Sequence, residues 1–92
     1  NDGSVIRLNI PSLTEERRKE LVKVVHKIIE EGRVAVRNIR RDANDLLKKS
    51  EKEHDLSEDN LRRAIDNIQE MTDQHIKNLN QIQETKEKDI LD

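Results

Sequence analysis

The 92 residues carry 18 Lys and Arg against 20 Asp and Glu, so the formal net charge is -2. Hydrophobic residues make up 32% of the chain and charged residues 41%, and it has no aromatic residue and no cysteine. This length allows at most one small domain. The missing cysteines exclude disulfides and thiolate chemistry. A core of Leu, Ile, Val and Ala alone is possible in a helical bundle, but it is thin.

The charges are unevenly distributed along the chain. Residues 12–49 hold 11 Lys and Arg against 7 Asp and Glu, a balance of +4, whereas residues 51–92 hold 6 against 12, a balance of -6. A helical protein with this pattern has a basic side and an acidic side.

The first residues have the pattern of a strand. From Ser4 to Ile10 apolar and other side chains alternate, and Pro11 follows. This alternation predicts a short, half-buried strand. The chain contains no second strand to satisfy its backbone groups. We therefore interpret the sequence as a fragment of a longer protein, in which residues 1–12 are a strand and linker remnant.

A first helix is predicted from about residue 15 to about residue 50. Thr14 is a suitable N-cap, and Glu15 and Glu16 follow in the first turn, where the helix dipole favours acidic residues. Apolar residues recur at positions 21, 25, 28, 35, 39, 43 and 46, and a flanking stripe occupies 22, 29, 36 and 43. Gly32 lies on the first stripe and can permit a close helix contact.

A second helix is predicted from about residue 58 to about residue 90. Ser57 is its expected N-cap, and Leu56 and Leu61 have the spacing of a hydrophobic staple. Its apolar residues fall at 61, 65, 68, 72, 76, 79 and 82. The connector from Glu51 to Asp55 is short, so the helices should be antiparallel. Residues 13–92 thus form a long helical hairpin.

The apolar face of the first helix is wider than one partner helix can cover. A third helix is therefore needed, either from a missing part of the protein or from a second copy. We expect the uncovered face to include Val22, Ile29 and Val36 and to drive self-association, most simply as a dimer. The predicted fold class is all-α, a two-helix hairpin that is part of a three-helix bundle, with an orphan N-terminal strand.

The segment from Arg33 to Asp45 points to function. Arg33, Arg37, Arg40 and Arg41 share one helix face of roughly 100°, and no acidic residue lies between Arg33 and Arg41. Guanidinium groups match phosphate geometry, so we expect this face to bind a nucleic-acid backbone. The alternative is a solvated face on a helical-bundle module that binds proteins and has no RNA role.

The sequence offers no catalytic, cofactor-binding or metal-binding motif. A glycine-rich phosphate loop is absent, and His26, His54 and His75 are far apart without metal-ligand spacing. We therefore do not expect an enzyme or a cofactor. A basic helix face also suits an acidic membrane surface, but the chain has no Trp or Phe as an interfacial anchor, so no membrane partner is expected.

Five segments of the chain have a distinctive sequence. They are Pro11-Ser-Leu-Thr-Glu-Glu-Arg-Arg-Lys-Glu-Leu21, Arg33-Val-Ala-Val-Arg-Asn-Ile-Arg-Arg-Asp-Ala-Asn-Asp45, Leu56-Ser-Glu-Asp59, Thr72-Asp73 and Lys86-Glu-Lys-Asp-Ile90. Together they resemble the C-terminal half of bacterial-type ribosome recycling factors. The resemblance covers essentially the whole chain, and its central block is long and specific.

The resemblance implies that Ser4–Ile10 is the last strand of an inserted β domain and that the two helices are the second and third of a three-helix bundle. It implies ribosome recycling after termination, with elongation factor G, in a bacterial cytoplasm or an organelle. It also implies that Arg37, Arg40 and Arg41, with Arg33 as a fourth, contact large-subunit rRNA, and that Arg40 matters most. Such a fragment should be inactive alone.

Two positions depart from the pattern of that family. Ser12 stands where a second proline is usual, and His75 stands where an aromatic residue is common. The second departure affects packing at the level of His75 and leaves the arginine face unchanged.

Overall fold

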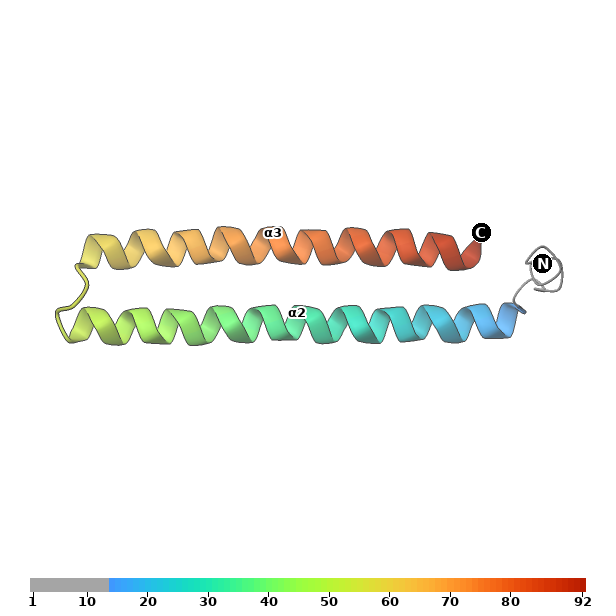
Figure 1. Ribbon diagram of the computed structural model, residues 1–92, viewed down its shortest axis with the longest axis horizontal. Helices are drawn as coiled ribbons and strands as arrows, with labels where there is room; N and C mark the ends of the chain where they lie inside the picture. Colours follow the sequence, from blue (N-terminus) through green and yellow to red (C-terminus); the bar gives the residue numbers. More distant parts are fainter. Residues whose placement is uncertain (1–13) are drawn as a thin grey trace, which may run out of the picture.

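The computed structural model describes residues 14–92 as two long helices, α2 (Glu15–Lys52) and α3 (Glu58–Leu91). They lie side by side and antiparallel in a hairpin 67 Å long (Figure 1). The predicted all-α hairpin, with helices at about 15–50 and 58–90, is confirmed. The strand predicted at 4–10 and the remnant assigned to 1–12 lie outside the described residues.

Both helices begin at the predicted N-caps. The Thr14 hydroxyl accepts a hydrogen bond from the backbone N–H of Arg17 at 3.0 Å, and the Ser57 hydroxyl accepts one from the backbone N–H of Asn60 at 3.1 Å. Each cap satisfies one N–H group that has no partner inside the helix. These two local signals fix where the helices start, independently of how the helices later pack.

The turn between the helices depends on a left-handed residue, His54, at φ 65°. The His54 N–H donates to the Glu51 carbonyl at 3.0 Å, and the Asp55 N–H donates to the Ser50 carbonyl at 2.9 Å. This pair of bonds is the Schellman pattern that ends many helices, usually with glycine at the left-handed position. Without glycine, the reversal carries a conformational cost at His54.

The face of α2 that packs on α3 is the flanking stripe. Ile29 is 6% exposed, whereas Ile28 of the main stripe is 59% exposed. Val22, Val36 and Ala43 are half-buried with Ile29. The prediction that Val22 and Ile29 lie on the uncovered face is therefore wrong, because α3 covers the stripe that was predicted to be free. Val36, which was predicted there too, is half-buried but also lines the hollow that remains open.

On α3, most of the predicted packing positions are correct. Thr72 is 6% exposed, and its hydroxyl donates to the Ile68 carbonyl at 2.7 Å. Ile82 is the exception, because it is exposed and Gln83 takes the place facing α2. The other predicted positions on α3 are half-buried, namely 61, 65, 68, 76 and 79.

The surface left uncovered is a groove that runs between the helices on one side of their contact. We call it the apolar groove, and its central hollow lies around Ile39 and Met71, both exposed. The hollow is lined by Val36, Ile39, Arg40, Ala43, Ile68, Met71, Thr72 and His75. The prediction of a further neighbour agrees with this open surface, which includes Val36 but otherwise consists of residues other than those expected.

Candidate nucleic-acid interface

The four predicted arginines lie along one edge of α2, and one of them, Arg40, also borders the hollow of the apolar groove. A face that only binds RNA would point away from α3, but two of the arginines, Arg33 and Arg40, are half-buried beside it. Arg37 and Arg41 are exposed. The arginine face therefore adjoins the helix contact, because Arg33 directly follows half-buried Gly32 and Arg40 lies one turn after half-buried Val36.

Arg33 is held against α3 by three hydrogen bonds and makes a fourth to Glu30 of its own helix. Its Nε and Nη2 atoms donate to Asn80 Oδ1 at 3.0 and 2.7 Å, and Nη2 also donates to Gln83 Oε1 at 2.7 Å. Its Nη1 donates to Glu30 Oε1 at 3.0 Å, and its side chain is only 20% exposed. Glu30 thus balances one of the arginine charges that the sequence had left unopposed.

Arg40 touches α3 more loosely. Its Nη1 donates to Gln69 Oε1 at 3.4 Å, a long contact. The side chain also borders a surface hollow on this edge of the hairpin, lined by Arg37, Arg40, Gln69, Thr72, Asp73 and Ile76. Two guanidinium groups therefore border one hollow, where a phosphate could meet both.

Arg37 and Arg41 complete the basic edge. Arg41 Nη2 donates to Asn38 Oδ1 at 2.9 Å on the same helix. The salt bridges within residues 14–92 join Arg17 to Glu20, His26 to Glu87 and Arg33 to Glu30. Arg37, Arg40 and Arg41 take part in none of these, so their charges have no carboxylate partner in the described part of the chain.

The α3 residues that face the arginines were missed in the sequence. The acceptors are Gln69, Asn80 and Gln83, and His26 pairs with Glu87 further along the same edge. The α3 residues of this edge form a row at alternating steps of four and three residues, namely Gln69, Asp73, Ile76, Asn80, Gln83 and Glu87. That spacing places them on one helix edge, but it does not show that this edge faces the arginines. We name these contacts between the helices the polar edge.

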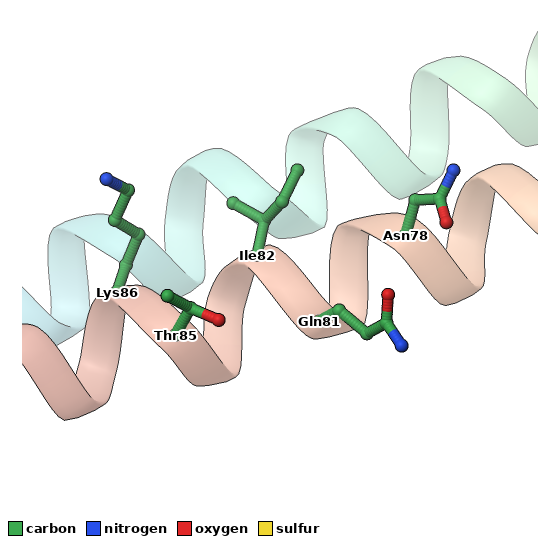
Figure 2. A pocket seen from close by; sticks show the side chains of 5 residues that line it. All are labelled: Asn78, Gln81, Ile82, Thr85 and Lys86. Atoms are coloured by element: carbon green, nitrogen blue, oxygen red, sulfur yellow. The ribbon is translucent and has the colours of Figure 1, made fainter.

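A further hollow lies on α3. Figure 2 shows this hollow, bordered by Asn78, Gln81, Ile82, Thr85 and Lys86, all on α3. It contains an exposed isoleucine among amides, a threonine and a lysine. This hollow lacks the convergent charged groups of the arginine edge, and with Ile82 it continues the uncovered side of α3.

Residues 14–92 contain no cluster of His, Asp and Glu that could hold a metal ion. Over the same residues, neither helix has an apolar stretch that could cross a membrane.

Comparison with known proteins identifies relatives that align with this chain over its entire length. The family profile described as "Ribosome recycling factor" matches residues 1–91. Similar proteins, each named "Ribosome-recycling factor", come from Halothermothrix orenii at 60% identity, Syntrophomonas wolfei at 62% and Symbiobacterium thermophilum at 59%. Each alignment covers 100% of this chain and 50% of the relative, so the chain spans about half of their length. The chain belongs to the ribosome recycling factor family.

Proposed function

We propose that this chain is the ribosome-binding half of a factor that recycles ribosomes after translation termination. It binds large-subunit rRNA through Arg33, Arg37, Arg40 and Arg41, and the complete factor acts with elongation factor G in the bacterial cytoplasm to split the post-termination complex. The factor catalyses no reaction of its own. Membership of the family supports the role, and the arginine edge supports the RNA contact.

The observation that supports the RNA contact is the number of N–H donors that the guanidinium groups leave unused within the hairpin. Arg37 and Arg41 are exposed, and Arg40 uses a single long hydrogen bond to a neutral amide. Arginine has five N–H donors, so these side chains keep most of their donors for phosphate oxygens. Arg33 contributes its charge to the same edge while its guanidinium is bonded to Glu30 and α3.

Salt dependence of binding to purified bacterial large ribosomal subunits tests the proposal. Contacts to phosphate release about 0.7–0.9 counterions each, so the log–log slope should be on the order of -3. Arg40→Ala should weaken binding by about 1–3 kcal/mol, and Arg40→Lys should recover only part, because lysine loses the bidentate fork. Arg63→Ala, which removes an exposed arginine of α3, is the matched control and should change little.

Equal affinity of Arg40→Ala and the parent chain would contradict the proposal. It would favour the alternative, a helical module that binds protein. The apolar groove supports that alternative, because an exposed apolar hollow between two helices suits a partner helix. In that case, binding to ribosomal subunits should be insensitive to salt.

The 92-residue chain alone should bind subunits without splitting ribosomes. The relatives are twice as long, and we propose that the absent half is needed with elongation factor G. Alone, the chain should self-associate as a dimer through the apolar groove. A recycling assay with elongation factor G and GTP checks the first expectation, and light scattering checks the second. Splitting at the rate of a full-length relative would overturn the first.

A further inference from the structure

We infer that Gln69 of α3 is a positioning residue for Arg40, a neutral acceptor that orients the guanidinium without cancelling its charge. The inference rests on the proposed contact between Arg40 and RNA. It assigns a part of the RNA-binding edge to α3, the acidic helix, although the arginines all lie on α2.

A short relay of hydrogen bonds connects the two helices at this point. Arg40 Nη1 donates to Gln69 Oε1 at 3.4 Å, and Gln69 Nε2 donates to Asp73 Oδ1 at 2.9 Å. Gln69 and Asp73 are one turn apart on α3, and all three border the same hollow with Arg37. The carboxylate thus reaches the arginine only through the amide.

The direction of the Gln69 amide follows from its two neighbours. If the amide were reversed, its NH₂ group would face guanidinium donors and its oxygen would face a carboxylate, and both contacts would be repulsive. Asp73 therefore fixes the amide with its oxygen toward Arg40. The oxygen in turn draws one Nη group toward α3 and leaves the other donors of that guanidinium for a ligand at the surface.

Neutrality is the property that matters at position 69. A carboxylate there would form a charge-assisted bond with the guanidinium, stronger than the present one, and would offset its charge. α3 carries eight Asp and Glu, yet the α3 acceptors that face Arg33 and Arg40 are Gln69, Asn80 and Gln83. Amides hold the arginines in place while leaving a positive edge for phosphate.

The test replaces Gln69 by glutamate and compares it with the same change at Gln74. Gln74 is exposed on α3 and donates to Asn78 of its own helix at 3.1 Å. The two variants have equal net charge, and they differ in whether the new carboxylate faces Arg40. Binding to purified bacterial large ribosomal subunits is measured over a salt series, with helix content and thermal melting as controls for folding.

Gln69→Glu should weaken binding about tenfold at low salt and reduce the log–log slope by about one, as loss of one phosphate contact does. Gln74→Glu should weaken binding less than about threefold and leave the slope unchanged, since its charge is remote and screened. Gln69→Leu, which removes the acceptor without adding charge, should weaken binding about threefold at an unchanged slope.

A second measurement needs no RNA. The ¹⁵N-labelled side chain of Arg40 should change its Nε–H resonance in Gln69→Leu and keep it in Gln74→Leu. Equal affinities and slopes for the two glutamate variants, or an unaltered Arg40 resonance, would overturn the inference and leave the RNA contact standing. Binding that is insensitive to Arg40→Ala would instead overturn the proposed function and this inference with it.

Discussion

The two sides of the hairpin differ in whether their side chains find partners within the chain. On the polar edge, Arg33 finds its acceptors within the chain, from Asn80, Gln83 and Glu30. In the apolar groove, Ile39 and Met71 remain exposed. Polar groups can be satisfied by neighbours or by water, whereas apolar side chains can be satisfied only by burial. The helix contacts of Arg33 on the polar edge are therefore satisfied within the chain, whereas we expect another surface to cover the groove.

The largest effect on this contrast is expected from placing a charged residue in the apolar groove. In a symmetric dimer, each copy would bury Ile39, which is 68% exposed in the single chain, and burial of such a side chain contributes about 1.5–3 kcal/mol. Ile39→Asp should thus raise the dimer dissociation constant at least about 100-fold, measured by sedimentation equilibrium. Val34→Asp, at an exposed valine outside the groove lining, is the control. A parent chain that stays monomeric at high micromolar concentration would refute the contrast.

The next largest effect concerns neighbouring isoleucines. Ile29→Ala should reduce the free energy of unfolding by about 2–4 kcal/mol, since it opens a cavity between the helices. Ile28→Ala should cost less than about 1 kcal/mol, because its side chain is 59% exposed. Urea denaturation of the dilute chain measures both. Similar losses would mean that the main stripe is covered too.

The polar edge should contribute less to stability than the apolar contact. Asn80→Ala removes the acceptor of two hydrogen bonds from Arg33, and each net bond is worth about 0.5–1.5 kcal/mol. We expect a loss of about 1 kcal/mol, against nearly none for Asn67→Ala, at an exposed asparagine of the same helix. If Asn80→Ala destabilised the hairpin as much as Ile29→Ala, the polar edge would be its main support.

Gly32→Ala should stabilise the hairpin slightly. A methyl group at Gly32 would meet the Cδ1 atom of Leu79 at 3.4 Å, an ordinary contact with the flexible end of a side chain. Alanine is better than glycine inside a helix by up to about 1 kcal/mol. A rise in the thermal midpoint is expected, and a fall would show that the helices need the glycine for closer approach.

The smallest effect is expected at the turn. His54→Gly should stabilise the chain by about 0.5 kcal/mol, because glycine adopts the left-handed conformation without a steric cost. Chemical denaturation measures the difference. His54→Ala keeps the Cβ atom and therefore the steric cost of the left-handed conformation, so it serves as the control. No gain for glycine over alanine would indicate that the conformation at φ 65° is not strained.

Several features could be read from short stretches of sequence. The N-caps at Thr14 and Ser57 act on backbone groups within one turn, so they do not depend on the rest of the fold. The antiparallel arrangement followed from the short connector. The arginine stripe was visible because helical spacing alone places residues on one face.

The α3 partners of Arg33 and Arg40 were not predicted, because they lie on the other helix. Arg33 reaches residues 47 and 50 positions away, and no local pattern reports such a distance. Only the register of α2 against α3 brings Asn80 beside Arg33 and Gln69 beside Arg40. The assignment of all four arginines to RNA remains a prediction.

By itself, the sequence determined two helices, their ends, a hairpin and an apolar surface wider than one partner can cover. The tertiary structure decided which part of that surface is covered. Val22, Ile29 and Val36 face α3, and Ile28 and Ile39 remain in the open. Periodicity gives the direction in which each side chain leaves its own helix. It does not tell which of two adjacent apolar stripes packs against the other helix. Choosing between them requires the simultaneous fit of apolar side chains and of the arginine–amide contacts along both helices.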